Sequence, residues 1–151
     1  MMIGKQRTRN ISWFLAAACL LFASCSRPSS SEGLGALPKS VAAADETSAI
    51  QTLRTVATAQ AQSRVIKGSY GDFNALAQAG YLDARFATTT PVSRGYRFTM
   101  SVTDAEFTLN ADPESSQSPQ NSRSRHLYLD SSDNVIHVNS NQAATKSDPV
   151  L

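Results

Sequence analysis

The sequence has few cysteines, few histidines and no long hydrophobic run. It contains two cysteines and two histidines in 151 residues. An almost wholly apolar run covers Ile11–Ala23, which is 13 residues, whereas a membrane-spanning helix needs about 20. Cys19 lies inside this run, so Cys25 would be the one cysteine left if the run were removed. These scarcities argue against a disulfide framework and make a membrane span the weaker interpretation of the N-terminal segment.

The chain also has little excess charge of either sign. It contains 14 basic and 12 acidic residues, and Lys5, Arg7 and Arg9 lie ahead of the apolar run. Without those three, 11 basic residues remain against 12 acidic ones. A nucleic-acid partner requires a concentrated basic patch, and the nearest approach to one is Arg123 with Arg125 in a loop rich in serine and asparagine. We therefore expect no nucleic-acid binding.

Residues 1–24 have the pattern of a secretory signal peptide. A positively charged start is followed by the short apolar run, and the small residues Ala23 and Ser24 come directly before Cys25. This order of charged, apolar and small residues is typical of a cleaved export signal. Arg7 and Arg9 are separated by Thr8, a pattern that does not support a twin-arginine signal.

The pentapeptide LFASC, residues 21–25, resembles the lipobox of bacterial lipoproteins. The resemblance implies cleavage before Cys25 and acylation of its thiol and new amine with fatty acids such as palmitate. Two or more acyl chains anchor a protein stably to a membrane. Ser26, in place of the aspartate that often retains such lipoproteins at the inner membrane, favours the outer membrane. The alternative is an ordinary signal peptide with a chance cysteine.

The residues after Cys25 divide into a tether, a domain and a tail. Residues 25–44 are rich in Ser, Gly and Pro, a composition typical of a flexible linker. Residues 45–139 are predicted to form one globular domain, and residues 140–151 a disordered tail. Pro38 is expected to prevent a helix from continuing back through the tether, because proline in a helix interior costs about 3 kcal/mol.

A long amphipathic helix is predicted from about Asp45 to Gly68. Asp45, Thr47 and Ser48 are candidate N-caps, and Glu46 would favour the positive helix end. Apolar residues recur at three- and four-residue steps. They are Ile50, Leu53, Val56 or Ala57, Gln60 or Ala61, and Val65. The opposite face carries Gln51, Arg54, Thr55, Thr58 and Gln62.

The pattern after Gly68 predicts a short second helix and four strands. Asp72 can cap a short helix that Gly80 closes. Apolar and polar residues alternate over 96–102 and 106–111, and a second hairpin is predicted from 126–130 and 135–138. The predicted fold is α+β, with one long N-terminal helix packed on a small four-stranded antiparallel meander sheet and a short second helix.

Several fragments in this order resemble type IV pilin-like and pseudopilin-like globular domains. The fragments are residues 48–60, SAIQTLRTVATAQ; residues 70–80; Gly95–Phe98; Ala111–Pro113; and residues 125–136. The resemblance implies the globular fold of that family. Pilins, however, begin with a prepilin peptidase site and a long apolar helix that forms the filament core. Because a lipoprotein signal and a linker stand there in this chain, the resemblance does not imply filament assembly.

The sequence predicts no catalytic, cofactor-binding or metal-binding residues. His126 and His137 could face each other across the second hairpin near Asp130 or Asp133, but no third ligand has metal spacing. Four acidic residues flank strand ends without the dense loop of oxygen ligands that calcium requires. They are Asp104, Glu106, Asp112 and Glu114. No nucleophile elbow or glycine-rich phosphate loop is present, so we expect no enzyme activity.

The favoured hypothesis is an exported, lipid-anchored protein of the cell envelope. Its pilin-like domain would act as a structural or protein-interaction module, with an unidentified protein partner, and would not form filaments by itself. One alternative is an envelope lipoprotein that binds a small ligand, and a weaker one is a hydrolase. A pocket of at least a few hundred Å³ with converging polar groups would favour these alternatives.

Overall fold

The first element, α1, is a long helix that begins earlier than the sequence predicts. The computed structural model describes residues 33–114 and 124–151, and α1 covers Gly33–Lys67. The expectation that Pro38 would prevent a helix was therefore wrong, and residues 33–44 of the predicted tether are helical. Three consecutive alanines at 42–44 are strong helix formers, and they join the segment to the helix that packs on the sheet. The predicted N-caps lie well inside α1.

One face of α1 is buried, as the apolar spacing predicts. Leu53 and Val56 have no exposed surface, and Ala49 is 1% exposed. The five residues predicted for the polar face are all exposed. Val65 was wrongly predicted to be buried, and 85% of its surface is exposed. The buried stripe passes through Ser63 instead. Val65 lies two positions after Ser63, and therefore points about 200° away from Ser63 around the helix.

The segment after α1 folds as predicted. Gly68 follows the last helical residue and has a φ of +79°, a left-handed conformation that glycine adopts without strain. Helix α2 covers Phe73–Gln78, and the Asp72 carboxylate caps it by accepting from the Ala75 N–H. A 3₁₀ turn, η1, follows at Ala84–Phe86.

The sheet has five antiparallel strands in the order β1-β2-β3-β4-β5, one more than predicted. The strands are β1, Val92–Ser93; β2, Tyr96–Val102; β3, Phe107–Pro113; β4, His126–Asp130; and β5, His137–Asn139. The additional strand, β1, is too short to show the alternation by which a strand is recognised in sequence. The alternating residues of β2, β3 and β4 point toward α1, and Phe98, Leu109 and Leu127 are fully buried.

The C-terminal residues belong to the fold, so the prediction of a disordered tail was wrong. Val150 bridges His137 in antiparallel register. The Val138 N–H donates to the Pro149 carbonyl, and the Leu151 N–H donates to the Ile136 carbonyl, both at 2.9 Å. Ala144 is 2% exposed. The sequence did not reveal this pairing because polar residues dominate 140–148 and His137 is distant along the chain from Val150.

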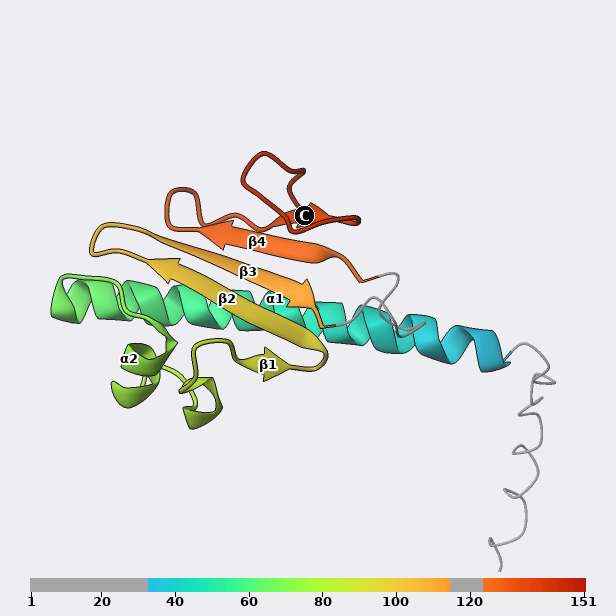
Figure 1. The fold of residues 1–151 in the computed structure, drawn as a ribbon, viewed down its shortest axis with the longest axis horizontal. Helices are drawn as coiled ribbons and strands as arrows, with labels where there is room; N and C mark the ends of the chain where they lie inside the picture. Colours follow the sequence, from blue (N-terminus) through green and yellow to red (C-terminus); the bar gives the residue numbers. More distant parts are fainter. Residues whose placement is uncertain (1–32, 115–123) are drawn as a thin grey trace, which may run out of the picture. The chain divides into compact units, whose positions relative to one another are not determined.

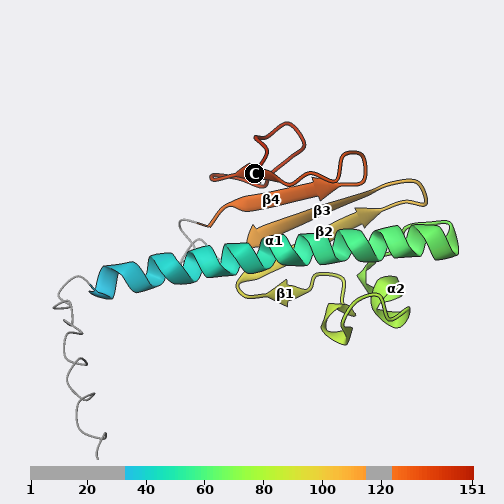
Figure 2. The same cartoon turned by 180° about the vertical axis from the view of Figure 1, so that it is seen from behind.

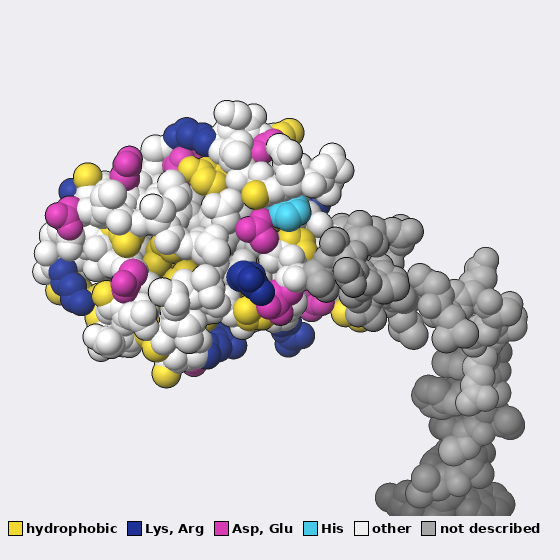
Figure 3. All heavy atoms as spheres, in the orientation of Figure 1, with side chains coloured by type: hydrophobic (Ala, Val, Ile, Leu, Met, Phe, Trp, Pro, Cys, Tyr) yellow, Lys and Arg dark blue, Asp and Glu magenta, His cyan; other side chains and the backbone are white. Residues whose placement is uncertain are grey.

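Helix α1 lies along one face of the sheet, and both views show this arrangement (Figures 1 and 2). Helix α2 lies beside one end of α1, near β1 and β2. The C-terminal segment, coloured red, lies at the opposite edge of the sheet, on the side of β4. On the face drawn in Figure 3, basic and acidic side chains are interspersed rather than gathered by sign.

Candidate interaction groove

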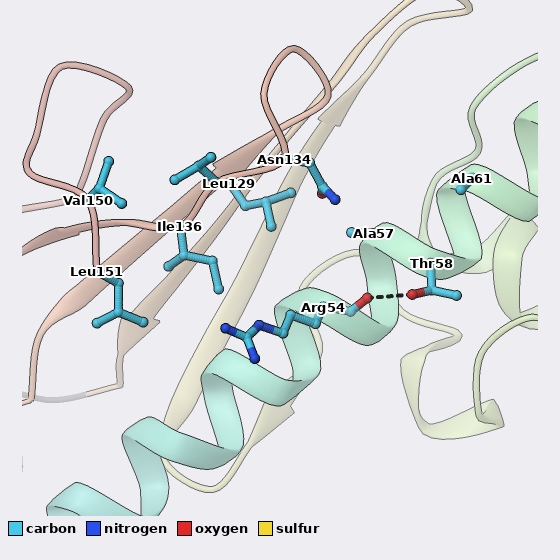
Figure 4. Close-up of a pocket in the computed structure, with 10 residues that line it drawn as sticks. Arg54, Ala57, Thr58, Ala61, Leu129, Asn134, Ile136, Val150 and Leu151 are labelled. Atoms are coloured by element: carbon cyan, nitrogen blue, oxygen red, sulfur yellow. Dashed lines mark hydrogen bonds between the residues drawn. The ribbon is translucent and has the colours of Figure 1, made fainter.

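A groove of about 560 Å³ runs between α1 and the β4–β5 side of the sheet (Figure 4). The helix wall is formed by residues at three- and four-residue spacing, which places them on one side of α1. They are Arg54, Ala57, Thr58 and Ala61. The small side chains at 57, 58 and 61 leave space beside the helix. This wall lies next to the buried stripe of α1, so the groove lies at the edge of the hydrophobic core.

The opposite wall comes from the end of β4, the turn after it and the C-terminal segment. It contains Leu129, Asn134, Val135, Ile136, Val150 and Leu151. Most of these side chains are apolar, and Val150 and Leu151 are 60% and 47% exposed. Thr58 directs its hydroxyl back to the Arg54 carbonyl at 2.9 Å. Arg54 and Asn134 are thus the polar side chains left to face a ligand (Figure 4).

Arg54 is a cation in this groove that has no partner among the residues the structure describes. Across residues 33–114 and 124–151, its guanidinium makes no hydrogen bond or ion pair with another residue. By contrast, Arg125 pairs with Glu46, and Arg97 pairs with Glu114. The close-up shows the Arg54 side chain extending from α1 toward the wall formed by Ile136 and Leu151. Among the described residues that line the groove, Arg54 is the charged side chain.

The C-terminal wall of the groove is held by a polar network. The Asp148 carboxylate accepts from the Thr145 N–H and hydroxyl at 2.7 and 2.9 Å, and from the Asn139 amide at 2.8 Å. The hydrogen bonds from Thr145 and then Asn139 lower the pKa of Asp148. On β3, the Asn110 amide donates to the Ala144 carbonyl at 2.9 Å. These contacts fix the segment that carries Val150.

A second group of polar residues joins the β4–β5 turn to the same segment. Burial opposes ionisation of Asp130, but hydrogen bonds from Ser132, Lys146 and Tyr128 outweigh it and lower the pKa of this carboxyl. Burial and the Asp130 charge together raise the pKa of Tyr128. Lys146 contacts the carboxylates of Asp130 and Asp133 at 3.3 and 3.8 Å and also donates to the Ser132 hydroxyl. Because Lys146 lies between these two carboxylates, its charge stabilises the β4–β5 turn.

The two histidines do not face each other across the hairpin. His126 lies opposite Asn139, and His137 lies opposite Tyr128. His126 Nδ1 lies 2.6 Å from the Asp112 carboxylate. His137 is 6% exposed, and its Nδ1 lies 2.7 Å from the Asp148 carbonyl oxygen. Because a carbonyl oxygen only accepts, this nitrogen carries the proton.

The other nitrogen of His137 has no hydrogen-bond partner in the described residues and lies 3.7 Å from an Asp133 carboxylate oxygen. No group of three or more potential metal ligands is formed by residues 33–114 and 124–151. The structure therefore does not bring His126, His137, Asp130 and Asp133 into one site.

The remaining charged residues singled out in the sequence lie away from the groove. Glu114 pairs with Arg97, Asp112 pairs with His126, and Asp104 contributes its carbonyl to Arg64. Glu106 is exposed near the β2–β3 turn. Cys25 and Arg123 lie outside the described residues, as does most of the polar loop around Asn121.

Arg125 has a structural role that the sequence did not indicate. Its guanidinium contacts the Glu46 carboxylate of α1 at 2.5 and 3.1 Å, and its backbone carbonyl accepts from the Tyr96 hydroxyl at 3.1 Å. Burial, followed by the Glu46 charge, raises the pKa of Tyr96 to about 12. Glu46 thus connects α1 to the start of β4 instead of serving a helix terminus.

Comparisons with protein-family models, curated proteins and solved structures find no match to this chain. Among the described residues, no helix has both the length and the hydrophobicity of a membrane span. The groove is the feature that sequence reasoning missed. Arg54 looked like one more polar residue on the solvent face of a helix, and the apolar pair Val150 and Leu151 after a polar segment was the only signal for the second wall.

Proposed function

We propose that this protein is a lipid-anchored component of the cell envelope whose domain acts as a protein-interaction module. The N-terminal lipobox-like sequence ending at Cys25 supports export and anchoring. The arrangement of one long helix on an antiparallel sheet agrees with the pilin-like globular fold that the sequence fragments suggest. A partner protein in the envelope would dock on the domain, and the domain alone would not polymerise.

The observation that carries this proposal is the open, mainly apolar groove with an unpartnered guanidinium. Monomeric proteins rarely leave large apolar surface uncovered without an interaction to use it. Val150, Leu151 and Ile136 present such surface beside Arg54. In the polar clusters nearby, by contrast, Lys146 pairs with Asp130 and Asp133, and Asp148 accepts hydrogen bonds from Thr145 and Asn139.

A small-molecule ligand is the second candidate. A volume of about 560 Å³ lies within the range of about 300–1,000 Å³ typical of ligand pockets. Two polar groups, the Arg54 guanidinium and the Asn134 amide, face this space. The groove is partly open to solvent, however, whereas small-ligand sites bury about 70–90% of their ligand, and for this reason we favour a protein partner.

Site-specific photo-crosslinking in cells tests the proposed function. A photoreactive amino acid placed at Thr58 or Val150 probes the groove. One placed at Thr99 probes the outer face of the sheet, and one placed at Arg94 probes the β1–β2 turn. Each variant is made with and without Cys25→Ala, which removes the predicted lipid anchor. We expect a defined crosslinked protein from at least one position in the anchored form. If no position yields a protein adduct, the interaction module is rejected.

A further inference from the structure

The edge of the sheet beside the groove has an unpaired backbone residue. Val150 forms a non-hydrogen-bonded antiparallel pair with His137, because the flanking bonds run from Val138 N–H to Pro149 and from Leu151 N–H to Ile136. In such a pair the N–H and C=O of the outer residue point away from the neighbouring strand. Within the described residues, the backbone N–H and C=O of Val150 make no hydrogen bond. They are available to a further strand.

A strand added at this edge would face the groove. The sheet order places β5, then the segment with Val150, at the end of the sheet. Groove residues of α1 lie across from this segment (Figure 4). Alternate side chains of a strand point to one face, so every second side chain of the added strand would enter the groove. There it would meet apolar groups from both walls and the guanidinium of Arg54.

We infer that the groove binds an extended peptide segment of a partner protein, with apolar side chains at alternate positions and a carboxylate among them. The inference rests on the proposed function and specifies the partner's chemistry. The backbone of the segment pairs with Val150, its apolar side chains cover Ile136 and Leu151, and its carboxylate pairs with Arg54. Strand addition of this kind draws affinity from backbone hydrogen bonds and specificity from pockets for alternate side chains.

Charge complementarity selects this occupant over others. Among the residues that the structure describes, the groove is lined by one cation without a partner and by no acidic side chain, so a carboxylate on the ligand gains a partner, whereas a basic or neutral segment leaves the guanidinium unpaired. The carboxylate can be an acidic side chain or a chain terminus, which share this chemistry. The outward N–H and C=O of Val150 can pair with an acceptor and a donor at fixed spacing, which a peptide backbone supplies.

Binding of blocked synthetic peptides to the purified full-length chain tests the inference. The probe is an eight-residue peptide of alternating valine and threonine in which one central valine is replaced by glutamate. Matched peptides carry glutamine or lysine at that position, and a fourth ends in a free carboxylate without an internal acid. We expect saturable binding of an acidic peptide, weakened about fivefold on change to glutamine, in line with an exposed ion pair. Absence of saturable binding by both acidic peptides would overturn the inference.

Three variants locate the binding. Arg54→Glu should lower the affinity for the glutamate peptide at least about fivefold and should raise the affinity for the lysine peptide, because the charge pairing is reversed. Val150→Pro removes the outward N–H without breaking a hydrogen bond within the domain, and should lower the affinity for every peptide. Arg94→Glu is the matched control, because Arg94 is an exposed arginine of the β1–β2 turn, outside the groove. Circular dichroism checks that each variant is folded.

The outcomes separate this inference from the proposed function. If Arg54→Glu and Arg94→Glu affect peptide binding equally, general charge rather than the groove is responsible, and the inference fails. If crosslinking in cells captures a protein only from Thr99, the interaction module stands and the groove is not its site. If neither peptides nor crosslinked proteins are found, both ideas fail together.

Discussion

The buried amide of Gln60 gives the sharpest test of how the long helix is fixed to the rest of the domain. Gln60 has no exposed surface. Its Nε2 donates to the Gly71 carbonyl at 2.7 Å and contacts the Met100 sulfur at 3.1 Å, and its Oε1 accepts from the Gly71 N–H at 3.0 Å. One side chain therefore satisfies both backbone groups of the residue that leads into α2.

The substitution Gln60→Leu keeps a similar volume but leaves both groups of Gly71 without a partner. A buried polar group without a hydrogen bond costs about 1–3 kcal/mol, and Gly71 is only partly buried. For the two Gly71 groups together the cost is about 2–6 kcal/mol. Because water can reach part of this site, we expect the lower half of this range, a loss of about 2–4 kcal/mol in the free energy of unfolding. This is a large share of the roughly 5–15 kcal/mol that stabilises a typical domain.

Urea denaturation of residues 33–151, followed by circular dichroism, measures this loss. Gln62→Leu is the matched control, since it makes the same chemical change two residues away on the exposed face. We expect its midpoint to stay near that of the parent chain. If Gln60→Leu is as stable as Gln62→Leu, the amide does not hold Gly71, and the argument that α2 is positioned through α1 is wrong.

Four further predictions follow. Leu53→Ala should lower the free energy of unfolding by about 2–5 kcal/mol in a urea melt, while Gln51→Ala should leave it nearly unchanged. Cys25→Ala should abolish incorporation of a labelled fatty acid, and equal labelling would refute lipidation. The lowered pKa of Asp130 stabilises the fold above about pH 4, and this stability is lost as the pH falls toward the folded-state pKa; Asp130→Asn should flatten the fall in stability between about pH 5 and pH 2. Light scattering should find residues 44–151 monomeric at micromolar concentration, and regular filaments in electron micrographs would contradict this.

Local signals account for most of the fold that the sequence predicted. Strands β2 and β4 begin and end where the alternation places them, and Asp72 caps α2 as its position at the start of the predicted short helix suggests. In each case the signal that predicts the element lies within a few residues along the chain. The amphipathic spacing of α1 likewise located its buried face, because helical period and burial are linked directly.

The errors that concern the C-terminal segment and the groove arose where distant contacts decide the structure. Whether residues 140–151 are ordered depends on the pairing of Val150 with His137 and on the hydrogen bond from Asn110 to Ala144. Neither contact has a local sequence signature. The same holds for Arg54, whose surroundings depend on where the C-terminal segment lies. The candidate groove could not be predicted, because one of its walls comes from a segment that showed no strand pattern.

The groove is also an arrangement that stability alone does not favour. Val150 and Leu151 keep about half or more of their surface exposed, and each CH₂ group buried would contribute about 0.8 kcal/mol. A larger apolar side chain at Ala57 or Ala61 would cover part of this surface, yet both positions carry the smallest apolar side chain that also favours a helix. The polar networks around Asp148 and Asp130 meanwhile hold the second wall in place. Filling this space with larger apolar side chains would bury more surface, whereas with alanine at positions 57 and 61 the groove remains available for the peptide segment proposed above.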